Sequence, residues 1–282
     1  MKLTQLKTDS GLVAAIVEGD KLRPVPNQTT GSLIVQAQAS GKPLAEVARA
    51  LALEELVEGE TAIPITPSEV WACGCTYAPS AEFRDGQTAG EQDGMYAYVH
   101  DVNHRPELFE KGGARVCVGP DEEIGIRKDS QFTAPEPELG LIVDSAGKIH
   151  AFTLANDVSA WDIERENALY LPQSKIFDGC CALGPVIVTP DEIADPYQLQ
   201  MTCTITRDGA ETFSGTCSTN QLKRKFEELV EYLLRSNSVP TPAVLLTGTG
   251  IIVTEAEALQ PGDVTAIEIP EIGRLANPAA IV

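Results

Sequence analysis

The chain has 282 residues, 43% of them hydrophobic, and a formal net charge of −20 at pH 7. This charge argues against binding to nucleic acid or to an anionic membrane, since both need a basic face, and no apolar run approaches the roughly 18 residues that span a bilayer. The seven irregularly spaced cysteines, together with a start that lacks a long apolar core, predict a reduced, cytoplasmic protein and not a disulfide scaffold.

The first 66 residues predict a small α/β domain. Residues 3–7 and 12–17 have the composition of strands around a turn at 9–11, and a third strand is predicted at 22–25. Residues 41–58 predict a helix, because Leu44, Val47, Leu51 and Leu56 recur at helical spacing without interior Gly or Pro. Two prolines in residues 62–70 mark a linker, so we expect a second domain over residues 67–282.

The second domain is rich in predicted strands. Short apolar runs alternate with Gly, Pro and Asp turns, at residues 70–75, 114–119, 139–143, 184–189, 199–209, 244–253 and 263–270. One helix is predicted near residues 220–235, where apolar side chains from Leu222 to Leu233 form a single stripe. The fold class predicted is therefore α+β, mostly β.

An acidic hairpin is predicted at residues 136–157. Glu136 and Glu138 share one face of a strand, because successive side chains alternate. Residues 144–147 have the composition of a hairpin turn, and the return strand brings Asp157 back towards the two glutamates. Spacing leaves two interpretations open: a solvated acidic sheet edge, or an oxygen cage for a hard cation such as Mg²⁺ or Mn²⁺.

Seven short segments in the same order resemble motifs of the fumarylacetoacetate hydrolase family. The resemblance covers roughly residues 70–278 and rests on CTYAPSAEF (75–83), RPELFEK (105–111), PEPELGLIV (135–143), NDVSAWD (156–162), KIFDGCCALGP (175–185), LLTGTG (245–250) and LQPGDVTAIEIPEIGRLANP (259–278). Each segment is weak evidence by itself, and their shared order makes the resemblance specific.

The resemblance implies a metal-dependent enzyme with a mixed β-roll catalytic domain, acting as a homodimer on a small 2-keto acid. It implies Mg²⁺ or Mn²⁺ bound by Glu136, Glu138 and Asp157, and Lys175 as the active-site lysine. It also implies substrate contacts from Tyr77 in the early motif and from Gly248 and Thr249 in the glycine–threonine loop.

A divalent ion that chelates a 2-keto acid withdraws electrons from the keto group and stabilises an enolate at C2–C3. This effect serves C–C hydrolysis of a 2,4-diketo acid, decarboxylation of a 2-oxo diacid and dehydration of a 2-keto-3-deoxy sugar acid alike. Hydrolytic family members carry a histidine shortly after the early tyrosine as the base for water, and this chain has Ser80 at that position. We therefore expect dehydration, with Lys175 and Glu82 exchanging protons with C3 and with the departing C4 hydroxyl.

The segments RKDS (127–130) and LYLPQ (169–173) resemble those of the sugar-acid-degrading branch of the family, which includes 2-keto-3-deoxy-pentonate dehydratases. Arg127, Tyr170 and Gln173 are accordingly predicted substrate contacts. C–C hydrolysis of a 2,4-diketo-3-deoxy sugar acid is the alternative, and a non-catalytic binding protein is the alternative from another class. Of the three histidines, His150 is expected at the surface, and His100 and His104 are expected in a loop.

Overall fold

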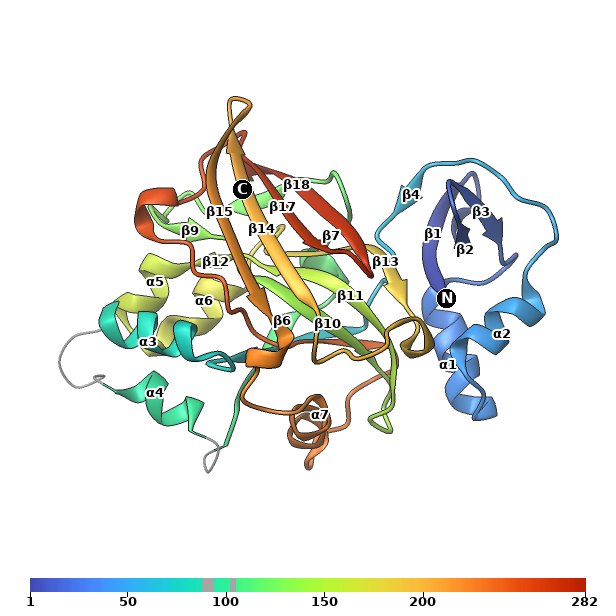
Figure 1. Ribbon diagram of the computed structural model, residues 1–282, viewed down its shortest axis with the longest axis horizontal. Helices are drawn as coiled ribbons and strands as arrows, with labels where there is room; N and C mark the ends of the chain where they lie inside the picture. Colours follow the sequence, from blue (N-terminus) through green and yellow to red (C-terminus); the bar gives the residue numbers. More distant parts are fainter. Residues whose placement is uncertain (88–93, 102–104) are drawn as a thin grey trace.

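The computed structural model describes residues 1–87, 94–101 and 105–282. A large mixed sheet forms the framework, and a second, mostly antiparallel sheet packs across β11 and β13 (Figure 1). The strands of the large sheet, in spatial order, are β3 (Lys21–Pro24), β2 (Gly11–Glu18), β1 (Lys2–Thr8), β13 (Cys181–Val188), β11 (Ile149–Asp157), β10 (Pro137–Val143), β16 (Ala243–Leu246), β5 (Glu69–Gly74) and β6 (Glu107–Gly112), with β4 (Thr61–Ala62) beside β1 and β7 (Cys117–Val118) beside β13.

The second sheet and the helices complete this architecture. The second sheet has the order β15 (Ala210–Ser218), β14 (Gln200–Arg207), β17 (Val264–Ile269), β18 (Gly273–Ile281) and β8 (Ile124–Ile126), and β9 (Thr133–Ala134) pairs with β12 (Ser159–Ala160). The helices are α1 (Thr30–Ser40), α2 (Leu44–Leu51), α3 (Ala78–Gln87), α4 (Met95–His100), α5 (Trp161–Glu166), α6 (Leu171–Lys175) and α7 (Phe226–Leu234). The predicted class, α+β with mostly β structure, is confirmed.

The N-terminal hairpin and third strand are confirmed, and the helix prediction for this region is wrong in its bounds. Helix α1 was not predicted; its first turn is capped by Thr29 and Ser32, and it ends at Gly41 in the left-handed region. Helix α2 stops at Leu51, because the Leu53 and Val57 amides donate to carbonyls of β3. Tertiary pairing therefore overrides the helical pattern there.

The N-terminal elements are not separated from the large sheet. Strand β1 pairs with β13, so the hairpin extends the same sheet, while α1 and α2 lie together at one end of the molecule and α3 to α6 lie at the other (Figure 1). The division of the chain at residue 66 stays a prediction.

Other sequence predictions differ from the structure in detail. The predicted strand at 114–119 begins with a 3₁₀ turn at Ala114–Val116. Of the helix predicted at 220–235, only the part that forms α7 is an α-helix. The strand predicted at 244–253 ends at Leu246, and Gly248 follows with φ of +91°. All seven cysteines are free, and no helix among the described residues is long and apolar enough to cross a membrane.

The acidic hairpin is confirmed. Strands β10 and β11 pair antiparallel with Pro137 opposite Asn156, and the Asp157 amide donates to the Glu136 carbonyl at 2.9 Å. The hairpin lies in the middle of the large sheet between β16 and β13. Pro137 is the first residue of β10, where a missing backbone donor is tolerated. This register places Glu136, Glu138 and Asp157 on one face.

The hairpin turn is held by the buried Asp144. Its Oδ1 accepts from the Ala146 and Lys148 amides, and its Oδ2 lies 2.8 Å from His150 Nε2. Asp144→Ala should lower the free energy of unfolding by about 2–4 kcal/mol, because it removes these bonds and leaves buried groups unpaired. Chemical denaturation measures this, with Asp9→Ala, an exposed turn residue between β1 and β2, as the matched control. Equal stability of the two variants would contradict the assigned role of Asp144.

Candidate metal centre

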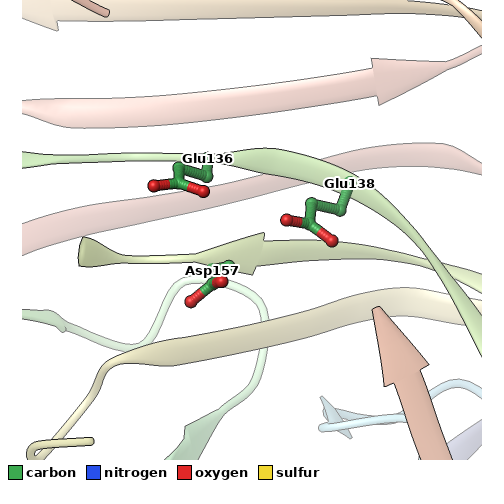
Figure 2. Close-up of side chains that lie close together, drawn as sticks. All are labelled: Glu136, Glu138 and Asp157. Carbon is green, nitrogen blue, oxygen red and sulfur yellow. The ribbon is translucent and has the colours of Figure 1, made fainter. Parts of the chain in front are cut away.

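Three carboxylates converge where the β10–β11 hairpin returns. Glu136 immediately precedes β10, Glu138 lies in β10, and Asp157 is the last residue of β11. One oxygen of each carboxylate lies within 4.8 Å of the others, and Figure 2 shows the three side chains close together. Glu138 and Asp157 are buried, and Glu136 is half-buried.

The backbone after β16 reaches into this cluster. The Gly248 amide donates to Glu138 Oε2 at 2.5 Å, and a Cβ at residue 248 would meet the Thr76 side chain and the Cys73 carbonyl. Burial raises the pKa of Glu138 well above its usual value, and the Asp157 and Glu136 carboxylates raise it further. In the ion-free protein, ionisation therefore costs more free energy at Glu138 than at the other two acids.

Two lysines offset part of this negative charge. Lys175 Nζ donates to Glu136 Oε1 at 3.0 Å, to Asp157 Oδ2 at 3.1 Å and to Ser159 Oγ at 2.6 Å. Lys111 Nζ lies 2.5 Å from Asp157 Oδ1 and donates to the Val158 carbonyl. Burial alone would raise the pKa of Asp157, but the two lysines outweigh it and lower that pKa.

The pKa of Lys175 is raised, whereas that of Asp157 is lowered. Burial by itself lowers the pKa of Lys175, but the carboxylates of Asp157, Glu136 and Glu164 outweigh burial and raise it above its usual value. The side chain is brought here by α6, whose last residue it is. Lys175 is therefore an ammonium in contact with the acids when no cation is bound to them.

The residues present fit a hard divalent cation. The donors are carboxylate oxygens only, from three side chains on one face, which is the ligand type that Mg²⁺ and Mn²⁺ prefer. Their mutual repulsion, expressed in the raised pKa of Glu138, is what a bound cation would relieve. The solvated-edge interpretation does not fit, because the hairpin is central in its sheet and two of the three acids are buried.

The structure places some predicted residues beside the cluster. Gly248 contacts Glu138 directly. Thr249 is buried and lines a small cavity beside Glu136, whose wall also contains Ser80 and Trp161. Tyr77 is buried, and burial together with the nearby Cys217 and Glu138 raises its pKa.

Other predicted residues lie elsewhere. Glu82 is exposed on α3, on the side of the helix away from the buried Ser80 and Arg84. Arg127 binds Asp129 and donates to the Gln173 carbonyl at 3.1 Å. Tyr170 is 36% exposed, just before α6. Among the described residues, no direct contact joins Glu82, Arg127, Tyr170 or Gln173 to the three acids.

Three buried charged residues of the cluster, Arg84, Glu164 and Lys111, were not predicted from the sequence. Arg84 NH2 lies 3.2 Å from Glu136 Oε2, and its guanidinium packs against the Trp161 and Tyr96 rings. Glu164 in α5 is 1% exposed and lies 3.5 Å from Arg84 and 4.0 Å from Lys175 Nζ. No local pattern marks Arg84 or Glu164. Lys111, by contrast, is the last residue of the quoted RPELFEK segment.

The two described histidines form no hydrogen bond or ion pair with the three acids. The surface position predicted for His150 is wrong: the side chain is buried and paired with Asp144 at the turn end of the hairpin. His100 Nδ1 lies 2.8 Å from the Cys75 carbonyl, and His104 lies outside the described residues. Ser159 accepts a hydrogen bond from Lys175, and Ala160 occupies the N-cap position of α5.

The chain is similar to known proteins over most of its length. Residues 84–280 match the family model described as fumarylacetoacetate (FAA) hydrolase C-terminal. The chain is 46% identical to a 2-dehydro-3-deoxy-D-arabinonate dehydratase of Saccharolobus solfataricus over 76% of this chain and 72% of the relative. It is 41% identical to a probable 2-keto-3-deoxyxylonate dehydratase of Haloferax volcanii, over 81% of this chain and 78% of the relative.

A solved structure gives the same likeness in three dimensions. A 2-keto-3-deoxy-D-arabinonate dehydratase complexed with magnesium and 2,5-dioxopentanoate superposes with a TM-score of 0.84 at 34% identity, covering 100% of this chain and 99% of that one. The likeness thus extends from the N-terminal hairpin through the second sheet.

The electrostatics predict that Glu138→Gln has opposite effects with and without a cation. Folding raises the pKa of this carboxyl, so its ionisation disfavours the folded state at any pH above the unfolded-state pKa. The destabilisation grows as the pH rises from the unfolded-state pKa to the folded-state pKa. At pH 7 the ion-free variant should therefore be more stable than the parent, by about 1 kcal/mol or more. Thermal melting with and without Mg²⁺ measures this.

With Mg²⁺ bound, the order of stability should reverse, and the parent should be more stable than Glu138→Gln. Loss of an outer-shell partner alone typically weakens metal affinity about 10- to 100-fold, so Glu138→Gln should lose at least that much in calorimetric Mg²⁺ binding. Glu166→Gln, the same change at an exposed position of α5, is the control. Equal Mg²⁺ affinity of the parent and Glu138→Gln would rule out this carboxylate as a ligand.

Proposed function

The chain belongs to the fumarylacetoacetate hydrolase family, and we propose that it is a Mg²⁺-dependent dehydratase of a 2-keto-3-deoxy sugar acid. The observation that carries this proposal is a buried cluster of three carboxylates with Lys175 in direct contact. The names of the relatives support it, as does the 2,5-dioxopentanoate bound to the similar dehydratase.

The absence of a histidine from the described cluster favours dehydration over C–C hydrolysis. Hydrolysis needs a base that activates water, and histidine is the usual group for that task near neutral pH. Ser80, at the position expected for the histidine, lines the cavity beside Glu136 and is buried. A serine hydroxyl does not take a proton from water unaided. Dehydration needs no attacking water, only removal and return of protons on the substrate.

Lys175 is the proposed proton-transfer residue, and Glu136, Glu138 and Asp157 are the proposed ligands. When bound, Mg²⁺ supplies polarisation of the 2-keto oxygen, which acidifies the hydrogens on C3. Once the acids share their charge with a cation, they hold the Lys175 proton less strongly, and burial favours the neutral amine. Lys175 then takes a C3 proton and returns it to the C4 hydroxyl as that group leaves as water. The resulting C3=C4 double bond gives 2,5-dioxopentanoate when a C5 proton moves to C3 and the C5 hydroxyl proton moves to C4.

The remaining substrate contacts follow from the cavity beside Glu136. Gly248 and Thr249 lie in the loop next to Glu138, and Tyr77 is buried beside this loop. We assign all three to substrate binding. Arg127, Tyr170 and Gln173 gather at α6, whose last residue is Lys175, and are proposed to meet the hydroxyl end of the substrate. A cytoplasmic homodimer completes the proposal.

One assay tests the proposed activity. With Mg²⁺, the protein should convert 2-keto-3-deoxy-pentonates to 2,5-dioxopentanoate, which is followed as an aldehyde or by mass spectrometry. Offering 2,4-diketo acids in parallel tests hydrolysis. Release of pyruvate without the dioxo acid would replace dehydration with C–C cleavage. Turnover of neither substrate, with Mg²⁺ bound, would leave the site as a binding site and end the proposal.

Lys175→Met should lower kcat by about 10²–10⁴-fold, the usual contribution of a positioned acid or base, and a folded variant should keep the carboxylate cluster. Lys148→Met, the same change at an exposed lysine of the hairpin turn, is the matched control and should retain activity. Near-normal kcat in a folded Lys175→Met variant would assign the proton transfer to another group.

A further inference from the structure

Two cysteines from distant parts of the chain meet beside the acidic hairpin. Strand β7 runs parallel to β13, and Cys117 is the register partner of Cys181. Residues paired in register lie on the same face of a sheet. A side-chain hydrogen bond with Cys117, together with burial, raises the pKa of Cys181 well above its usual value. These two residues, the thiol pair, are therefore in contact.

One member of the thiol pair is open to solvent. All seven cysteines lie in the described part of the chain, and Cys117 is the one that is not buried. Its thiol donates to the Gly113 carbonyl at 3.4 Å, whereas Cys181 is 0% exposed. Oxidation of cysteine follows exposure of the thiol. A thiol oxidant therefore reaches Cys117 first, and Cys181 is already in contact with it.

The thiol pair is joined to the carboxylate cluster through the backbone. Asp157 is the register partner of Cys181 across the β11–β13 pair. The next residue, Val158, donates its amide to the Cys180 carbonyl at 2.9 Å. Its own carbonyl accepts from Lys111, the lysine that forms an ion pair with Asp157. A displacement of β13 at Cys181 is therefore passed directly to Asp157 and to its partner.

Building on the proposed metal ligands, we propose that the thiol pair is a reversible modification site for a hydroperoxide, and that its disulfide weakens Mg²⁺ binding at Asp157. With hydrogen peroxide, the sulfur of Cys117 attacks one oxygen and the O–O bond breaks, which gives a sulfenic acid and water. The sulfur of Cys181 then attacks the sulfur of Cys117, and the hydroxyl group leaves as water with the Cys181 proton. The two thiols lose two electrons and two protons, and the peroxide is reduced to two molecules of water.

The backbone permits this bond. Neighbouring strands lie about 4.8 Å apart, within the separation of roughly 4.4–6.8 Å between Cα atoms that disulfides span. Strand β7 is only two residues long, so few ladder bonds resist its movement. A covalent bond between two sulfur atoms that are now in non-bonded contact draws β7 and β13 together. Because Asp157 is held in register with Cys181, its carboxylate moves relative to the two glutamates.

Oxidation of the folded protein tests the site. With hydrogen peroxide, the parent should lose two of its seven thiols and the mass of two hydrogen atoms, and dithiothreitol should restore both. Cys117→Ser should keep all its thiols, whereas Cys180→Ser, the matched change at the neighbouring cysteine, should still lose two. Gain of oxygen without loss of a thiol pair, or loss of a pair in Cys117→Ser, would overturn the proposal. If Cys117→Ser does not fold, Cys181→Ser replaces it and should form no disulfide.

Calorimetric titration with Mg²⁺ tests the consequence. The oxidised parent should bind Mg²⁺ about tenfold more weakly than the reduced parent, at the lower end of what outer-shell changes cost, and dithiothreitol should restore the affinity. Peroxide-treated Cys117→Ser should bind like the reduced parent. Equal Mg²⁺ affinity of the two forms of the parent would overturn the effect on the metal. Failure of Mg²⁺ to bind even the reduced parent would reject the proposed metal centre, and the disulfide result would stand independently.

Discussion

The structure depends on one costly constraint, the burial of acids and bases against one another at the return of the β10–β11 hairpin. Removing such charges from water is offset only when each finds partners at short range. Asp157 has two lysines, Lys175 has two acids and Ser159, and Glu138 has the Gly248 amide. The negative charge that these contacts leave unbalanced falls mainly on Glu138, and it makes the cluster suited to a divalent cation.

The surrounding architecture serves to hold these groups. The hairpin is central in the large sheet, and its turn is tied by Asp144. Elements far apart in the chain close over it: β6 brings Lys111, α3 brings Arg84, and α6 brings Lys175. A substrate therefore meets buried lysines and acids that share their charge across short contacts.

Much of this could be predicted from local sequence, and the errors have common causes. Strand alternation placed Glu136 and Glu138 on one face, and the turn composition at 144–147 returned Asp157 to them, since both are short-range properties. The helix at 41–58 was predicted too long because residues 53 and 57 pair with β3. Glu82 was predicted at the site and is exposed, whereas Arg84 on the same helix is buried, because only the packing of α3 decides which side of the helix faces the cluster.

The sequence by itself determined the class of the fold, the acidic hairpin and the absence of a nearby histidine in the early motif, and the family motifs suggested Lys175 as the active-site lysine. Only the tertiary structure decided that Arg84 and Glu164 complete the cluster, and that His150 is buried far from it. Arg84 is 52 residues from Glu136 in the chain. Which charges become neighbours across such a separation depends on how sheets and helices pack, and no local pattern of residues records it.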